Sequence, residues 1–93
     1  MKEKVLLRSR KWLNPPASDD TGAISSVVTV DTFVKDSKYV DGSIEIRDCG
    51  RSITLSFYAL TPSALQRKIK KANLLIDEIT KFRDALIEAE KLM

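Results

Sequence analysis

The sequence contains no histidine, one cysteine and only three glycines. Without histidine, the chain has no histidine-based catalytic triad and no zinc site of the usual histidine and cysteine type. Three glycines are too few for a Walker-type loop or a dinucleotide-binding turn, and neither motif occurs. These absences predict a protein that is not an enzyme and carries no cofactor or metal. Acid-only chemistry, which needs no histidine, is the enzymatic alternative.

Long apolar runs are also missing. The longest covers residues 57–60, so we expect no membrane span. Near the start, Val5-Leu6-Leu7 is followed at once by Arg8, and this run is too short for the apolar part of a signal peptide. A lone cysteine cannot form an internal disulfide. We therefore expect a soluble cytoplasmic protein that folds as a single domain over residues 1–93.

Residues 61–93 predict one long helix. Thr61 can cap the first turn, Pro62 suits the first helical position, and no glycine or proline follows. Helices of this kind rise about 1.5 Å per residue, so the predicted length is roughly 45 Å. Apolar side chains recur at steps of three and four residues along one face: Leu65, Ile69, Ala72, Leu75, Ile76, Ile79, Phe82, Leu86, Ala89 and Met93.

Residues 24–60 alternate between apolar and polar side chains, as strands with one buried face do. We expect three strands, over residues 24–34, 40–47 and 52–59, joined as an antiparallel meander. A two-residue turn at Cys49-Gly50 would pair Asp48 with Arg51. In this register, five apolar residues share the side that faces the helix and are predicted to be buried: Ile44, Ile46, Ile53, Leu55 and Phe57.

Residues 1–23 form a basic arm and a polar loop. The alternation over residues 5–13 permits a fourth strand, and a short helix is the alternative. Asp19-Asp20 in the loop are expected to be turn formers rather than metal ligands, and Cys49 an inert turn residue. The expected fold class is α+β: a three-stranded antiparallel meander, with a possible N-terminal fourth strand, packed on one long C-terminal helix.

The net charge of +3 is unevenly distributed along the chain. Residues 1–12 carry +4, residues 13–60 carry −3, residues 61–72 carry +4 and residues 73–93 carry −2. Basic side chains at the start of a helix oppose its dipole, so something is expected to compensate. Three things could offset this unfavourable positive charge: screening by salt, the phosphate backbone of a nucleic acid, or a second copy of the helix running antiparallel.

Two functional classes suit this pattern. The first is a small non-enzymatic regulatory protein that binds nucleic acid, largely without sequence specificity. The second is a protein-binding adaptor or inhibitor of viral or mobile-element type, acting through the helix or sheet surface. Trp12 either stacks on a base or covers the helix as an apolar plug. Two basic clusters would carry the nucleic-acid contacts: Arg8, Arg10, Lys11 and Trp12 in the arm, and Arg67, Lys68, Lys70 and Lys71 in the helix.

The predicted helix is longer than the predicted sheet. A strand of about seven residues spans roughly 23 Å, so much of the apolar stripe would extend past it. Large exposed apolar patches usually mark an interface. We therefore expect a homodimer, with an interface formed by Ile79, Phe82, Leu86 and Met93. The alternative cover is the N-terminal segment, with Trp12 and Leu13 folded back over the helix.

Overall fold

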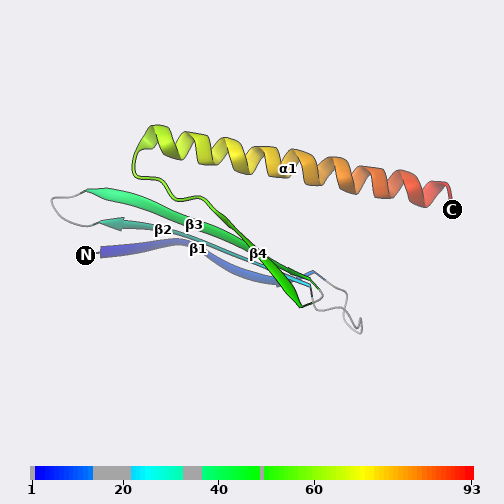
Figure 1. Ribbon diagram of the computed structural model, residues 1–93, viewed down its shortest axis with the longest axis horizontal. Coiled ribbons are helices and arrows are strands. Elements are labelled where there is room, and N and C mark those ends of the chain that lie inside the picture. Colours follow the sequence, from blue (N-terminus) through cyan, green and yellow to red (C-terminus); the bar gives the residue numbers. More distant parts are fainter. Residues whose placement is uncertain (1, 14–21, 33–36, 49) are drawn as a thin grey trace.

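The structure is a computed structural model that describes residues 2–13, 22–32, 37–48 and 50–93. Within these ranges the chain forms four strands followed by one helix (Figure 1). The elements are β1 (Lys2–Trp12), β2 (Ala23–Thr32), β3 (Lys38–Asp48), β4 (Arg51–Ser56) and α1 (Pro62–Lys91). The predictions for Asp19-Asp20 and Cys49, and for residues 33–34 at the end of the first predicted strand, lie outside the described residues.

The sheet is an antiparallel meander in which the spatial order of the strands follows the chain. The predicted α+β class is therefore confirmed. The N-terminal arm forms the fourth strand rather than the short helix, because β1 pairs with β2 from Lys2 opposite Thr32 to Trp12 opposite Ala23. The pairing shifts by one residue between Val5 and Leu7.

The β3–β4 hairpin has the predicted register. Asp48 lies opposite Arg51, and the apolar positions pair as Ile46 with Ile53 and Ile44 with Leu55. Gly50 in the turn has φ 77°, a left-handed conformation that glycine adopts without steric cost. Beyond β4, the Phe57 amide donates to the Gly42 carbonyl at 2.8 Å. A Cβ at residue 42 would lie only 3.3 Å from that of Phe57, so glycine permits this close approach.

Helix α1 begins as predicted. The Ala64 amide donates to Thr61 Oγ1 at 3.1 Å, and Pro62 occupies the first turn. The helix ends at Lys91, two residues earlier than predicted. It lies over one face of the sheet and extends well past its end, so the molecule measures 60 × 27 × 19 Å (Figure 1). No helix among the described residues is both long and apolar enough to cross a membrane.

The prediction that five apolar sheet residues are buried is wrong, although their common face is confirmed. Ile44, Ile46, Leu55 and Phe57 are half-buried, and Ile53 remains 57% exposed. The reason is incomplete cover, because α1 has no buried residue and leaves a cleft of about 350 Å³ between itself and the sheet. The side chains lining this cleft include Leu7, Val28, Val40, Ile44 and Phe57 from the sheet and Leu65, Lys68, Ile69 and Ala72 from α1.

The N-terminal segment does not provide the missing cover. Trp12 closes β1 and is 68% exposed, and Leu13 after it is 54% exposed. Leu13 instead continues the β1–β2 pairing, since its amide donates to the Gly22 carbonyl at 2.9 Å. The expectation that Trp12 and Leu13 fold back over the helix is therefore wrong. The alternative role of Trp12, as an apolar plug that covers the helix, is wrong for the same reason.

Candidate nucleic-acid interface

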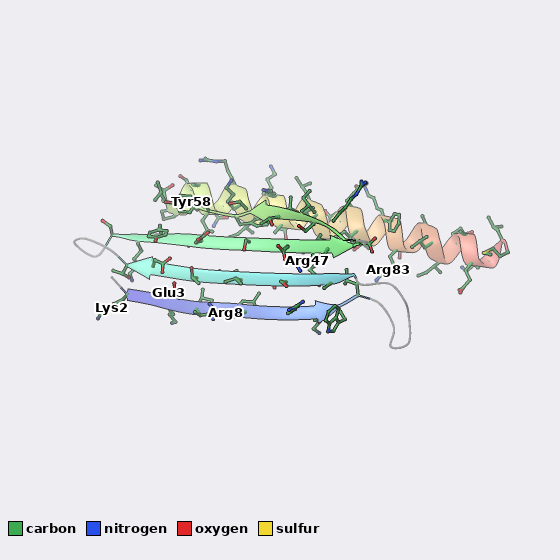
Figure 2. The ribbon with its side chains drawn as sticks, turned by 60° about the horizontal axis from the view of Figure 1, so that its bottom comes forward. Lys2, Glu3, Arg8, Arg47, Tyr58 and Arg83 are labelled. Carbon is green, nitrogen blue, oxygen red and sulfur yellow. The ribbon has the colours of Figure 1, made fainter. Side chains whose placement is uncertain are left out.

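The basic residues of β1 are divided between the two faces of the sheet. Leu7 lines the cleft beneath α1, and the neighbouring positions alternate along the strand. Arg8, Arg10 and Trp12 therefore share the face that points away from α1, whereas Lys11 lies on the helix side. Figure 2 shows the sheet from the side away from α1 and labels Arg8 on β1.

The strand register builds a row of four residues across this outer face. Trp12 lies opposite Ala23, Ala23 opposite Arg47, and Arg47 opposite Ser52. Ala23 is the small member of the row and is only 3% exposed. It forms the floor of a hollow of about 430 Å³, which Trp12 and Arg47 flank. We name this feature the outer hollow; its lining residues are Arg10, Trp12, Ala23, Arg47, Gly50, Arg51 and Ser52.

Three arginines line the outer hollow together with the exposed indole, and one of them, Arg10, contacts the ring. The guanidinium carbon of Arg10 lies 5.1 Å from the centroid of the Trp12 ring, which is a cation–π distance. Arg47 Nε donates to Glu45 Oε1 at 3.0 Å. Exposed ion pairs of this kind contribute about 0–1 kcal/mol, so a phosphate group can compete with Glu45 for Arg47.

Sequence reasoning missed Arg47 and Arg51 as binding residues, because it assigned basic contacts only to the N-terminal arm and the helix. The signal that would have found Arg47 is the register across three strands. Once β1 is accepted as a strand opposite β2, the pairing of Ala23 with both Trp12 and Arg47 brings the two large side chains to either side of one alanine.

The first turn of α1 contains no acidic residue. The basic cluster of α1, which we name the helix cluster, consists of Arg67, Lys68, Lys70 and Lys71, and these four side chains lie in different surroundings. Arg67 and Lys70 are exposed, and Lys68 is half-buried and lines the cleft beneath α1. Lys71 Nζ donates to the Ser56 carbonyl at 2.8 Å and lies 4.7 Å from the centre of the Phe57 ring. Lys71 therefore connects α1 to the chain that leaves β4.

The contacts of Lys71 offset positive charge at the start of α1 in a way that the sequence did not suggest. A backbone carbonyl and the face of an aromatic ring both carry partial negative charge, and both lie against this ammonium group. The chain thus offsets part of the positive charge at the start of α1 by itself. Arg67 and Lys70 remain the exposed bases of the helix cluster.

The structure does not bring the two basic clusters together. Arg8, Arg10 and Trp12 lie on the outer face near the β1 edge, whereas the helix cluster lies above the opposite face and contacts the chain at the β4 edge. Because β1 and β4 are the two outer strands, the whole sheet separates the clusters. A single bound strand would have to pass around an edge of the sheet to reach both.

The other end of the outer face has a different character. Tyr39 and Tyr58 lie with their ring centroids 5.6 Å apart, and Asp31 beside them is 6% exposed. Burial, the charge of Asp31 and a hydrogen bond to Asp31 together raise the pKa of the Tyr39 hydroxyl. The negative charge at this end disfavours phosphate, so the basic end around Trp12 is the part of the face suited to an anionic ligand.

Comparison of the chain with protein-family models, with curated proteins and with solved structures found no match.

Proposed function

We propose that this chain is a small non-enzymatic regulatory protein that binds nucleic acid, largely without sequence specificity. The observation that carries the proposal is the outer hollow, where an exposed tryptophan contacts Arg10 on its own strand and lies across Ala23 from Arg47. Aromatic rings that accept a base, with basic side chains that accept the adjoining phosphates, are the usual elements of sequence-tolerant binding. The expected location in the cytoplasm stays a prediction.

The outer hollow suits unpaired bases better than a duplex. Stacking on Trp12 requires a base whose face is free, and paired bases present only their edges in the grooves. Arg67 and Lys70 on α1 would add phosphate contacts, which position a nucleic acid without reading its sequence. Lys71 is already engaged by Ser56 and Phe57, so we assign it a smaller share of phosphate binding.

The intrinsic fluorescence of the protein tests the proposal directly, because Trp12 is the only tryptophan in the chain. Titration with an unlabelled single-stranded oligonucleotide at low salt is expected to quench this fluorescence to a plateau, and added salt should reverse the quenching. The affinity should fall with salt at a slope near −0.7 per phosphate contact for single strands or −0.9 for duplex. If neither DNA nor RNA binds at tens of micromolar, the proposal is wrong.

Charge-neutralising variants identify the contacts. Arg10→Gln and Lys70→Gln should each reduce the salt slope by about one contact. Lys81→Gln is the matched control, because it removes the same charge from an exposed position of α1 that belongs to neither basic cluster. Equal effects of all three substitutions would show that only the net charge matters and that neither cluster is a binding site.

The second functional class, a protein-binding adaptor or inhibitor of viral or mobile-element type, is favoured by a different observation. The C-terminal half of α1 exposes large apolar side chains, including Ile79 at 60%, Phe82 at 66% and Leu86 at 56%. Patches of this kind on isolated chains mark interfaces. The same surface suits a second copy of the chain, and we therefore propose that the protein is a homodimer.

A further inference from the structure

Nine of the ten residues of the apolar stripe of α1 are arranged symmetrically about Ile79; the tenth, Leu75, has Arg83 at the mirrored position. Toward the N-terminus the symmetric positions are Ile76, Ala72, Ile69 and Leu65. Toward the C-terminus they are, at the same four separations, Phe82, Leu86, Ala89 and Met93. A two-fold axis through Ile79, perpendicular to the helix, therefore superposes these nine positions on a reversed copy of themselves.

This symmetry is what an antiparallel pair of identical helices requires, since two-fold interfaces use the same surface on both subunits. The stripe also pairs small side chains with large ones, because Ala72 would meet Leu86 of the second copy and Ala89 would meet Ile69. Alternation of small and large residues is how facing helices interdigitate. Ile79 would meet itself on the axis.

We infer that a second copy of this chain packs on α1 and inserts apolar side chains into the cleft beneath it, with the C-terminal half of its helix antiparallel beside the N-terminal half of the first. This gives a geometry to the homodimer proposed above. Leu65, Ile69 and Ala72 line the cleft and belong to the stripe, so the symmetric partner positions fall at the cleft. The cleft also extends across the sheet to Leu7 of β1, which leaves apolar sheet surface for the incoming helix.

The exposed surface of the chain is large enough for such a partner. The chain exposes 7,830 Å², whereas a compact monomer of its mass exposes about 5,400 Å². The excess of roughly 2,400 Å² per chain, or about 4,800 Å² for two chains, falls within the total of about 2,000–5,000 Å² that permanent dimers bury. The radius of gyration of 17.0 Å, against about 12 Å for a compact chain, indicates the same open shape.

The charges on α1 agree with the antiparallel arrangement. Residues 61–72 carry +4 and residues 73–93 carry −2, so each basic half would lie beside an acidic half. In the register centred on Ile79, Lys68 falls opposite Glu90 of the second copy. Lys68 is half-buried at the cleft, so this ion pair would form at the interface rather than on the outer surface.

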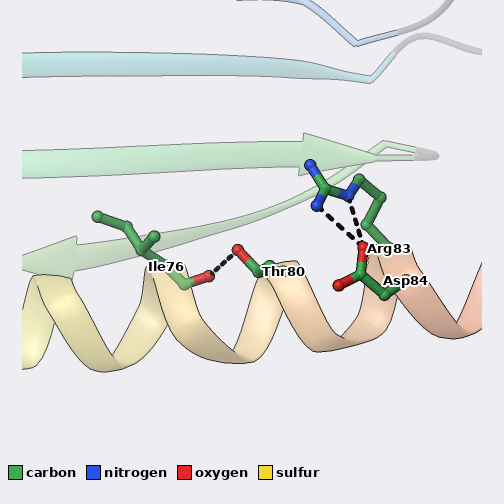
Figure 3. Close-up of polar contacts among 4 residues, drawn as sticks. All are labelled: Ile76, Thr80, Arg83 and Asp84. Atoms are coloured by element: carbon green, nitrogen blue, oxygen red, sulfur yellow. Dashed lines mark hydrogen bonds and ion pairs between the residues drawn. The ribbon is translucent and has the colours of Figure 1, made fainter.

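Three polar side chains close to the proposed two-fold axis, those of Thr80, Arg83 and Asp84, already have partners within α1 (Figure 3). Thr80 Oγ1 donates to the Ile76 carbonyl at 2.7 Å. Arg83 donates through Nη2 and Nε to Asp84 Oδ1 at 2.9 and 3.1 Å. An apolar partner can therefore pack on Ile79 without leaving these groups unpaired, which would otherwise oppose association.

Cysteine cross-linking tests the register. In a Cys49→Ser background the chain has no thiol, and Ile79→Cys then places one on the proposed axis. A disulfide requires Cα atoms within about 7 Å, and the two copies of residue 79 would meet on the axis. Mild oxidation should therefore convert this variant to a covalent dimer. Asp77→Cys is the control, since it lies two residues away on the opposite side of α1 and should remain monomeric on a non-reducing gel. An equal mixture of Ala72→Cys and Leu86→Cys chains should form the mixed disulfide.

Charge exchange provides a second measurement that does not depend on disulfide chemistry. Lys68→Glu and Glu90→Lys should each weaken the dimer at least tenfold in sedimentation, and the double variant should recover most of the loss. The inference is wrong if the chain is a monomer at micromolar concentration. It is also wrong if Asp77→Cys cross-links as well as Ile79→Cys, or if native mass spectrometry finds a monomer holding a small apolar molecule.

These outcomes are separate from those of the nucleic-acid proposal. A monomer that quenches its tryptophan fluorescence on adding an oligonucleotide would overturn the dimer alone. A dimer with the Ile79 register that binds no oligonucleotide would overturn the nucleic-acid proposal alone.

Discussion

Replacing Phe82 by alanine is expected to dissociate the dimer with little effect on the folding of each chain. Phe82 is 66% exposed in the isolated chain, and an aromatic side chain buries roughly 200 Å² when it is fully covered. The part left for a partner is therefore about 130 Å², which at about 25 cal/mol per Å² corresponds to about 3 kcal/mol per chain. A dimer contains two copies, so the loss is about 6 kcal/mol, or roughly 10⁴-fold in the dissociation constant.

Leu74→Ala is the matched control for this prediction. Leu74 is 61% exposed on the same helix, close to the value for Phe82, but it lies off the symmetric stripe. Sedimentation equilibrium over a range of concentrations should show dissociation of Phe82→Ala and an unchanged assembly for Leu74→Ala. Thermal unfolding at a concentration where both are monomeric should give similar stabilities. Equal shifts in the dissociation constant for the two variants would refute the reasoning.

Two further predictions concern the sheet. Leu55→Ala should lower the free energy of unfolding by about 1–3 kcal/mol, less than for a fully buried leucine because Leu55 is only half-buried. Thr54→Ala on the outer face should cost under about 0.5 kcal/mol. Urea denaturation that gives equal losses would contradict the assigned faces. The pKa of the Tyr39 hydroxyl is raised in the folded chain, so this group stays neutral to higher pH there than in the unfolded chain. Its contribution to the free energy of unfolding is therefore fully present below about pH 10 and is lost as the pH rises through the raised pKa. Tyrosinate absorbance should show a late-titrating component that Tyr39→Phe removes.

Local patterns in the sequence predicted most of the secondary structure. Thr61 and Pro62 start the helix because capping depends only on neighbouring residues. The turn before Arg51 set the hairpin register because a one-residue slip would have moved every apolar residue to the other face. The first 13 residues left strand and helix open, since a short alternating segment satisfies both patterns until a partner strand is known.

Periodicity identifies which side of an element is apolar, but it does not say how closely two layers approach. The five predicted core residues share the expected face and are still not buried, because α1 leaves an open cleft above the sheet and buries none of its own residues. The separation of a helix and a sheet depends on how all the side chains between them pack. This depends on long-range contacts that no window of sequence contains.

The candidate site shows the same division between local and long-range information. The sequence by itself determined that a basic cluster lies near the start of α1 and that nine of the ten stripe residues are symmetric about Ile79. It placed Arg10 and Trp12 on one side of a strand only on condition that the N-terminal arm forms one. Only the tertiary structure decided that Arg47 completes the outer hollow and that Lys71 is held by Ser56. The physical reason is that alternation and helical spacing act over a few residues, whereas the meeting of β1, β2 and β3 depends on the pairing of strands far apart in the chain.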